Sequence, residues 1–402
     1  MILLESIFRI CPLKELKNHV YLIIGGMMAQ KKKLKMKDGT KTILKSIGVL
    51  FAVILVLFII YRNNINEIRK VGYSEKASAV ILRSFQKKFV LSRPFSETLN
   101  RAFESNHFKE ENMDSYSKIE FQDQKSLIRN INTLINKKYS NQEISMILTR
   151  GNDEDVTEFA KRDKIQYLEE IYSIPFAKLR NYDRYMEYMN ETGVDENTAV
   201  IHINLGMDKD IYEDPITVDS HDIDILVNKR RRLSEKFAPK NLVSISEKYA
   251  KDGNQKGVKV AVESLTKMID AARKEGQEIF VTSGYRSYQD QLETVNTYRD
   301  LYGDSYINNF VSLPGHSEHQ TGLAFDLGSK TSSIFRSSKE FTWMTENAHK
   351  FGFIYRFQLN KEELTGFRSE PWHFRYVGKE AAEKIYNNRL SLEEYYVMYL
   401  SD

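Results

Sequence analysis

One uninterrupted apolar run near the N-terminus constrains this chain more than any other feature. Residues 47–61 read IGVLFAVILVLFIIY, and Ile43 and Leu44 extend the run past Lys45. Nineteen residues of helix, 43–61, span roughly 28 Å, close to the thickness of the hydrocarbon core of a bilayer. The run therefore predicts one transmembrane helix.

Charged residues around the run predict its orientation. Only Arg62, Arg69 and Lys70 follow it closely, whereas seven lysines precede it: Lys31, Lys32, Lys33, Lys35, Lys37, Lys41 and Lys45. Positive charge is retained on the cytoplasmic side of a membrane. We expect a basic cytoplasmic tail over 1–42, an anchor over 43–62 and the remainder of the chain outside the cell.

An apolar run of this kind can also be a buried core helix or a cleaved signal peptide. A buried core helix is disfavoured by the flanking lysines, and a cleaved signal peptide would need a small-residue site soon after the run. Ala77-Ser78-Ala79 has that pattern but lies sixteen residues beyond the run, so we expect a retained anchor. Upstream, Gly25-Gly26 before Met27-Met28 suggests that translation starts at Met27 or Met28.

The distribution of charge argues against a nucleic-acid-binding protein, and the single cysteine excludes an intrachain disulfide framework and a metal site built from cysteines. The chain of 402 residues has a formal charge of +4, but residues 1–62 carry eleven Lys or Arg against three Asp or Glu, which leaves residues 63–402 at −4. No basic stripe remains for phosphates, so we expect no nucleic-acid partner. Cys11 is the single cysteine, so a metal would be held by His and carboxylate side chains.

The middle of the chain is expected to be a spacer. Residues 63–199 are rich in Asn, Lys, Glu and Tyr and predict a helical stalk or wall-binding segment. Two stretches within it are weakly similar to each other, and Ser74 and Ser140 are the expected helix caps in them. Residues 200–239 predict a connector with strands at Val200–Leu205 and Ile223–Val227. His202 and His221 there are expected to be structural, and 230–232 (Arg-Arg-Arg) to be a solvated charge run.

From about Lys240 the pattern predicts a separate domain, 240–402. A helix ending at Gly276 precedes a buried strand, Ile279–Thr282, which leads into Ser283-Gly284-Tyr285-Arg286. Ser287 with Asp290 forms a capping-box pattern for the next helix. An arginine at a strand end suits anion or oxyanion binding, although an isolated one is more often part of a structural ion pair.

Two further segments concentrate metal-binding side chains. The first contains His316, His319 and Asp326, and the second, 370–373, contains Glu370 and His373. A zinc hydrolase needs three nitrogen or oxygen ligands and an open position for water, together with a separate carboxylate for proton transfer. His319, Asp326 and His373 satisfy the first requirement, and Glu370 the second.

These motifs together resemble the VanY-like family of zinc D-alanyl-D-alanine carboxypeptidases, which includes L,D-carboxypeptidases. The resemblance covers about 240–390 and lies in three stretches: 283–287 (Ser-Gly-Tyr-Arg-Ser), 317–326 (Ser-x-His-x-x-Gly-x-x-x-Asp) and 370–376 (Glu-Pro-Trp-His-Phe-Arg-Tyr). It departs from the family pattern at Phe357 and over 257–264, which bears on substrate preference.

The resemblance implies a role for each matching residue. Zn²⁺ is expected on His319, Asp326 and His373, with Glu370 as catalytic base and proton shuttle and Arg286 on the oxyanion or the substrate. Substrate contacts are expected from Gln291, Ser317 and Tyr355. His316 is expected beside the metal and not on it.

The resemblance also implies a fold, a substrate and a location. We expect an α+β domain whose small antiparallel sheet forms a zinc cleft with packed helices, preceded by the transmembrane helix and the helical stalk. The implied reaction removes the terminal D-alanine of peptidoglycan stem peptides outside a bacterial cell membrane, from a single-pass protein. Alternatives are L,D-carboxypeptidase action on tetrapeptide stems, a wall endopeptidase, and a catalytically inactive cell-wall-binding module.

Overall fold

The computed structural model describes residues 38–165, 168–212, 214–251 and 253–401. The chain divides into two compact units, 1–108 and 109–402. Residues 1–37, including the expected start at Met27 or Met28, lie outside the described part.

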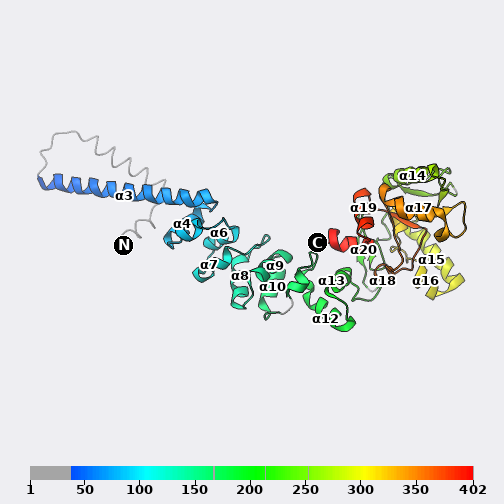
Figure 1. The fold of residues 1–402 in the computed structure, drawn as a ribbon, viewed down its shortest axis with the longest axis horizontal. Coiled ribbons are helices and arrows are strands. Elements are labelled where there is room, and N and C mark those ends of the chain that lie inside the picture. The colour runs from blue at the N-terminus through cyan, green and yellow to red at the C-terminus, as the bar shows by residue number, and fades with distance from the viewer. Residues whose placement is uncertain (1–37, 166–167, 213, 252, 402) are drawn as a thin grey trace. The chain divides into compact units, whose positions relative to one another are not determined.

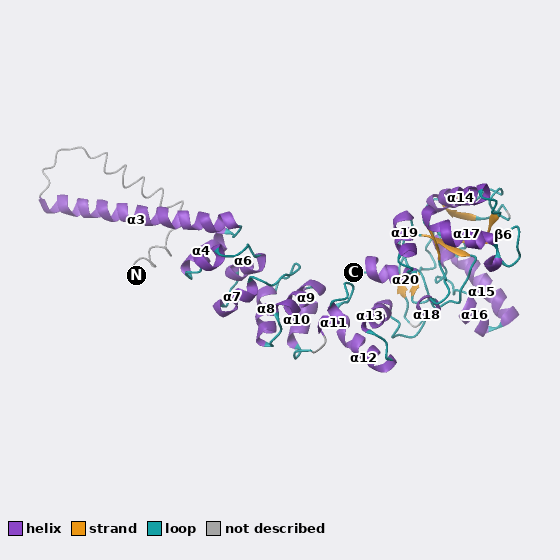
Figure 2. Cartoon of the chain, in the orientation of Figure 1, coloured by secondary structure: helices purple, strands orange, loops and turns teal. Residues whose placement is uncertain are grey.

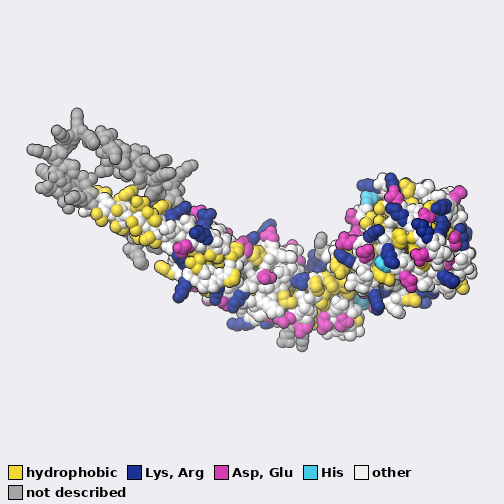
Figure 3. Space-filling model, turned by 45° about the horizontal axis from the view of Figure 1, so that its top comes forward, with side chains coloured by type: hydrophobic (Ala, Val, Ile, Leu, Met, Phe, Trp, Pro, Cys, Tyr) yellow, Lys and Arg dark blue, Asp and Glu magenta, His cyan; other side chains and the backbone are white. Residues whose placement is uncertain are grey.

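The first unit is helical and is dominated by one long helix, α3. Its helices are α3 (Asp38–Val71), α4 (Glu75–Arg83), α5 (Lys87–Leu91) and α6 (Glu97–Glu104). Large apolar side chains are exposed along the first part of α3, and Figure 3 shows them as a continuous yellow surface. Ser46–Val71 has the length and composition of a membrane span or a signal sequence. The far end of α3 instead buries Ile65 and Ile68 within the unit.

The second unit begins with stacked short helices (Figure 1). They are α7 (Met113–Tyr116), α8 (Leu127–Asn136), α9 (Asn141–Arg150), α10 (Asp153–Lys161), α11 (Leu168–Tyr172), α12 (Tyr182–Thr192) and α13 (Glu196–Leu205). Hydrogen bonds between neighbouring helical segments join residues that are 26 to 28 positions apart in the sequence. Ile165 N donates to Tyr139 Oη, 26 residues away, and Asn204 Nδ2 donates to Phe176 O, 28 residues away. Residues 63–199 are thus mostly helical, as expected, and Ser74 and Ser140 cap α4 and α9.

A buried polar triad recurs in this helical array. Asn132 Oδ1 accepts hydrogen bonds from Asn112 Nδ2 at 2.7 Å and from Tyr116. Asn204 Oδ1 accepts the same pair of bonds, from Asn181 Nδ2 at 2.9 Å and from Tyr185 Oη at 2.7 Å. Because an unpaired buried amide is costly, each triad fixes how its helices pack.

Both strands predicted for 200–239 were wrong. Val200–Leu205 lies in helix α13, which Asp195 caps at its N-terminus and Gly206, at φ +77°, ends. Residues 223–227 form no strand: Ile223 lies in a turn, and Arg375 Nη2 donates to the carbonyls of Ile223 and Ile225. Strand pairing in this region joins β1 (Ile216–Thr217) and β2 (Arg231–Arg232) in parallel.

The arginines at 230–232 do not form a solvated run. Arg230 and Arg231 are half-buried. Arg230 Nε donates to Gly206 O at 3.0 Å, and the Arg231 guanidinium lies 4.4 Å from the centroid of the Tyr396 ring. These contacts join the helical array to the domain that follows it.

A four-stranded antiparallel sheet organises the rest of the second unit (Figure 2). Its strand order is β5-β6-β8-β7, with β5 (Ile279–Ser283), β6 (Ala324–Ser329), β7 (Phe353–Tyr355) and β8 (His373–Tyr376). A hairpin of β3 (Leu242–Ser244) and β4 (Lys256–Val258) lies beside it. The main apolar core joins this sheet to α14 (Lys259–Lys274) and α17 (Lys339–Asn347). The remaining helices are α15 (Tyr288–Tyr302), α16 (Asp304–Phe310), α18 (Glu362–Thr365), α19 (Lys379–Asn387) and α20 (Leu392–Tyr395).

The predicted capping box is present at the start of α15. Ser287 accepts from the backbone N–H of Asp290, and Asp290 accepts from the backbone N–H of Ser287. The apolar side chains of α15 are only partly buried, since Val295 is covered but Leu301 is 64% exposed.

Candidate metal centre

Strand pairing brings together two of the predicted ligands. In the antiparallel register of β6 and β8, Asp326 lies directly opposite His373. His319 lies in a short 3-10 turn, Glu318–Thr321, that precedes β6. Gly322 ends this turn at φ +68°, a conformation that favours glycine, and so directs the chain back into the strand.

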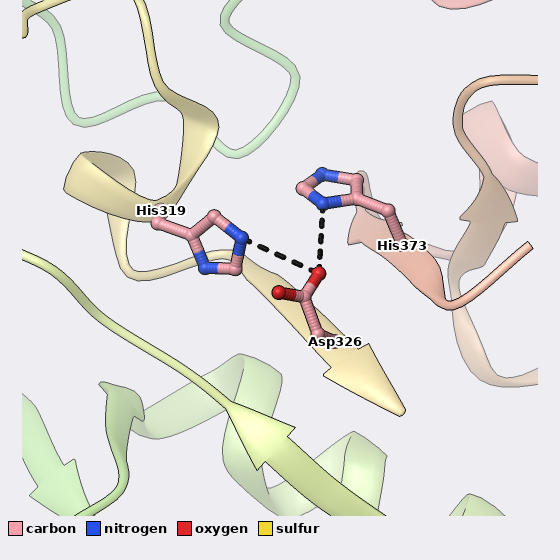
Figure 4. A group of neighbouring side chains, drawn as sticks. All are labelled: His319, Asp326 and His373. Carbon is pink, nitrogen blue, oxygen red and sulfur yellow. Dashed lines mark hydrogen bonds and ion pairs between the residues drawn. The ribbon is translucent and has the colours of Figure 1, made fainter. Parts of the chain in front are cut away.

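The three side chains converge on one point, as Figure 4 shows. Asp326 Oδ1 lies 3.4 Å from His319 Nε2 and 3.1 Å from His373 Nδ1. One donor atom from each residue lies within 4.8 Å of the other two. Both histidines are buried, whereas Asp326 is partly accessible. The geometry is that of a three-ligand metal site.

The other nitrogen of each imidazole is held by a partner. His319 Nδ1 lies 2.7 Å from the carbonyl oxygen of Gly284. His373 Nε2 lies 3.2 Å from Glu318 Oε2. Partners of this kind orient a ligating histidine and select its tautomer. They leave His319 Nε2 and His373 Nδ1 directed at the shared point.

The charge states of the three side chains differ. Burial lowers the pKa of His373, but its hydrogen bonds to Asp326 and Glu318 more than offset this and raise it to about 9, so a metal ion would displace a proton from this imidazole. Burial raises the pKa of Asp326, but the two flanking imidazoles more than offset this and hold it well below its usual range. Burial lowers the pKa of His319, and the charge of Arg286 lowers it further. A carboxylate and two imidazoles form a donor set that fits zinc.

Glu370 and Arg286 line the same cavity, which has a volume of about 260 Å³. Glu370 begins a tight turn into β8, in which the N–H of His373 donates to Glu370 O at 3.1 Å. Burial raises the pKa of Glu370 to about 7. Within the described residues, Arg286 Nε is buried and has no hydrogen-bond partner. The cavity thus holds a carboxylate and a guanidinium beside the metal ligands.

The three expected substrate contacts do not all reach this cavity. Gln291 and Ser317 line it. Tyr355 does not: it lines a different cavity, and its hydroxyl lies 2.6 Å from Ser369 Oγ. Tyr355 pairs with Phe374 across β7 and β8, and consecutive strand residues point to opposite faces, so Tyr355 and His373 face apart. His316 lines the same cavity as the candidate ligands His319, Asp326 and His373, and its Nδ1 lies 2.8 Å from Asn228 O.

Sequence reasoning missed the buried ionic network behind His373. Glu318 Oε1 accepts from Arg356 Nε at 2.8 Å and from Arg375 Nη1 at 3.1 Å. Arg356 also makes a bidentate pair with Glu393, at 2.8 and 2.6 Å. Glu318 and Arg375 stand inside two of the motifs, which was the available signal, but nothing local links them to Glu393.

Comparison with known proteins agrees with this site. Residues 255–379 match the VanY family model, described as D-alanyl-D-alanine carboxypeptidase. The chain is 42% identical over 182 residues to the putative carboxypeptidase YodJ of Bacillus subtilis (strain 168), covering 42% of this chain and 66% of that protein. It is 31% identical to a D-alanyl-D-alanine carboxypeptidase of Enterococcus faecium over 237 residues, covering 56% of this chain and 71% of that one.

Further matches include another curated relative and two solved structures. A D-alanyl-D-alanine carboxypeptidase of Enterococcus faecalis (strain ATCC 700802 / V583) is 41% identical over 33% of this chain, which spans only 52% of that protein. Among solved structures, the LdcB LD-carboxypeptidase is 38% identical with a TM-score of 0.43, covering 47% of this chain and 94% of that one. VanYB in complex with D-alanine-D-alanine is 36% identical with a TM-score of 0.39, covering 43% and 96%.

The antiparallel sheet carries a His-Asp-His group that, within the described residues, could hold a metal ion. By its relatives and the family model, the chain belongs to the VanY family of D-alanyl-D-alanine carboxypeptidases.

Proposed function

We propose that this protein is a zinc-dependent D,D-carboxypeptidase that removes the terminal D-alanine of peptidoglycan stem peptides. One observation carries the proposal: the donor atoms of His319, Asp326 and His373 lie within 4.8 Å of one another, in a cavity that Glu370 and Arg286 also line. Membership of the VanY family supports the reaction and the substrate class.

In this proposal zinc is held by His319, Asp326 and His373, and the sheet of β5, β6, β7 and β8 forms one wall of the zinc cleft. When bound, zinc supplies Lewis-acid chemistry, which makes water a nucleophile at neutral pH and polarises a carbonyl group. The remaining steps belong to side chains of the cavity.

Glu370 acts as the base of the reaction. Its carboxylate takes a proton from the attacking water and later delivers a proton to the amine of the departing D-alanine. Its burial keeps the carboxyl group in an environment where both protonation states are accessible, since the pKa lies near 7. The tight turn at 370–373 holds it in front of the ligands.

Arg286 stabilises the oxygen that becomes negatively charged during the attack. Its buried Nε makes no hydrogen bond within the described residues, and a guanidinium in a partly enclosed cavity stabilises a negative charge more than it would in open water. Gln291 and Ser317, which line the same cavity, are proposed to contact the stem peptide. We propose no substrate role for Tyr355, because its side chain lies on the other face of the sheet.

The test is a release assay on two substrates. The full-length protein, loaded with zinc in detergent, is incubated with a stem pentapeptide or a tetrapeptide, and free D-alanine is measured with and without a chelator. The proposal expects release from the pentapeptide that the chelator abolishes. Release from the tetrapeptide alone would replace it with L,D-carboxypeptidase activity, and no release from either would favour a wall-binding module.

We further propose that the protein is anchored in a bacterial cell membrane by residues 43–62. The basic tail, 1–42, is then cytoplasmic, the helical stalk, 63–199, and the connector, 200–239, lie outside, and the catalytic domain is 240–402. The exposed apolar surface of α3 supports the anchor. Retention is supported by Ala77 and Ser78, which are fully buried in α4 and so sit at a site that a peptidase would not reach in the folded unit.

A further inference from the structure

Four aromatic side chains form a continuous stack on the α15–α16 hairpin, which Figure 1 shows at one side of the catalytic part. Tyr298 and Tyr302 lie one turn apart on α15, and Tyr306 and Phe310 one turn apart on α16. Ring centroids are 6.0 Å apart for Tyr298 and Tyr302, 4.7 Å for Tyr302 and Tyr306, and 4.9 Å for Tyr306 and Phe310. We call these four residues the aromatic ladder.

The ladder is not the core of the hairpin. A separate apolar cluster of Val295, Ile307 and Val311 holds the two helices together. Three rings of the ladder remain substantially exposed: Tyr298 is 37% exposed, Tyr302 59% and Phe310 41%. Exposed apolar surface of this kind, joined to a cavity, marks a binding surface.

Three of the four rings of the ladder line the candidate active site. Tyr298, Tyr306 and Phe310 line the same cavity as the metal ligands, whereas Tyr302 lies outside it. A ligand that reaches from the metal across the ladder would therefore have its reactive end at Glu370 and another part on the rings. The ladder is continuous with the site and extends it outward.

The charge around the ladder indicates what that second part is. Residues 288–310 contain four acids, Asp290, Glu293, Asp300 and Asp304, and one arginine, Arg299. Arg299 is already paired with Asp304 at 2.8 Å. The Arg368 guanidinium lies 5.7 Å from the centroid of the Phe310 ring, so charges of both signs lie along the edge of the ladder. Its rings suit a neutral ligand with an apolar face and polar edges.

We propose that the aromatic ladder is a subsite for an N-acetylated amino sugar of the glycan to which the stem peptide is attached; the inference rests on the proposed function. A pyranose ring offers a face of C–H groups to stack on aromatic rings and a rim of hydroxyl and acetamido groups for hydrogen bonds. Tyrosine matches both, with a flat apolar ring and a polar hydroxyl at its edge.

The inference predicts that the enzyme discriminates between two forms of one substrate. The full-length zinc-loaded protein in detergent is assayed for release of D-alanine from a stem pentapeptide carried on an N-acetylglucosamine–N-acetylmuramic acid disaccharide, and from the same pentapeptide free. Tyr302→Ala is compared with wild type on both, since Tyr302 lies outside the cavity.

Wild type is expected to show the higher kcat/KM on the disaccharide-linked peptide, and Tyr302→Ala to lose about three- to tenfold on that substrate alone. Tyr302→Phe, which keeps the ring, should retain most of the preference. Tyr399→Ala is the matched control, because Tyr399 is 52% exposed and stacks on Tyr395 at the C-terminal end of the chain. It should change neither rate.

Equal kcat/KM of wild type on the two substrates overturns the subsite while leaving the proposed activity intact. An equal loss on both substrates in Tyr302→Ala overturns it too, since the ring would then act through the fold. A second measurement uses wild type alone: chitin oligosaccharides should inhibit release from the disaccharide-linked peptide, and their failure to do so at millimolar concentration contradicts the inference. Absence of release from either substrate instead contradicts the proposed function.

Discussion

His373 stands between two carboxylates, and each has a different task. The Asp326 carboxylate lies 3.1 Å from His373 Nδ1, at the candidate metal site. The Glu318 carboxylate lies 3.2 Å from His373 Nε2, on the opposite side of the ring. Glu318 is itself fixed, because Arg356 and Arg375 both donate to its Oε1. Burial raises the pKa of Glu318, but these two arginines more than offset this and keep it an anion. The orientation of one ligand therefore depends on a charge outside the ligand set.

We predict that Glu318→Gln weakens zinc binding by about 10- to 100-fold, because the amide loses the charge that orients and polarises His373. Equilibrium dialysis against a competing chelator measures the affinity. Glu340→Gln is the matched control: Glu340 is also a buried carboxylate, but it bonds Thr331 and not a ligand, so this change should lower stability and leave zinc affinity intact. Unchanged affinity in Glu318→Gln would contradict the orienting role.

A second residue-scale prediction separates the base from the ligands. Glu370→Gln should retain zinc and lose about 10²- to 10⁴-fold in kcat, because the amide cannot accept the proton of the attacking water. His373→Ala should lose zinc itself, because one of the three donors is gone. Metal content by atomic absorption and steady-state kinetics check both. A near-normal rate in Glu370→Gln would show that another group is the base.

At the scale of elements, the site depends on how closely β4 approaches the end of β5. A Cβ added at Gly284 would lie 2.4 Å from Lys256 O, a backbone atom of β4 that also accepts from the N–H of Tyr285. Gly284 O in turn holds His319. Because residue 284 is a glycine, β4 can pack against the end of β5, and the carbonyl of the same residue contacts the candidate ligand His319.

Gly284→Ala is predicted to destabilise the catalytic domain by about 2 kcal/mol, because the added methyl forces β4 away. It should also weaken zinc binding, since Gly284 O moves with the backbone. Gly276→Ala is the control: Gly276 has φ +77° and open space around it, so alanine costs about 1 kcal/mol through strain alone. Urea unfolding and zinc titration compare the two. Equal zinc affinity in both variants would refute the link.

At the scale of the whole molecule, α3 carries two kinds of surface. Its first part exposes apolar side chains from Ile47 to Ile60, and its last turns bury Ile65 and Ile68 against the first helical unit. If the proposed anchor is correct, its helix continues into the folded unit without a linker. The change of surface occurs at Tyr61 and Arg62, where the apolar run ends.

The full-length protein is therefore expected to stay in the membrane pellet after alkaline carbonate extraction, because a spanning helix is not held by charge. A chain beginning at residue 63 should appear in the soluble fraction and still release D-alanine. Immunoblotting of the two fractions and the release assay measure both outcomes. Extraction of the full-length protein by carbonate would contradict a spanning helix.

Several features of this protein could be predicted from residues that are close together in the sequence. The capping box at Ser287, the caps at Ser74 and Ser140 and the apolar run at 47–61 each depend on neighbours within a few residues. The candidate ligands were also predictable, because few residue types bind zinc and they cluster in short motifs. Val200–Leu205 was misread because α13 is buried on several sides, which hides the helical period, although Asp195 and Gly206 mark its ends.

By itself, then, the sequence determined the apolar helix, the helix caps and the residues of the candidate metal site, since these follow from local periodicity and residue type. Only the tertiary structure decided that Tyr355 faces away from the site, that Arg375 satisfies the carbonyls of Ile223 and Ile225, and that Glu318 orients His373. The physical reason is that strand register and buried charge pairing join residues far apart in the chain. Their partners exist only once the sheet has formed.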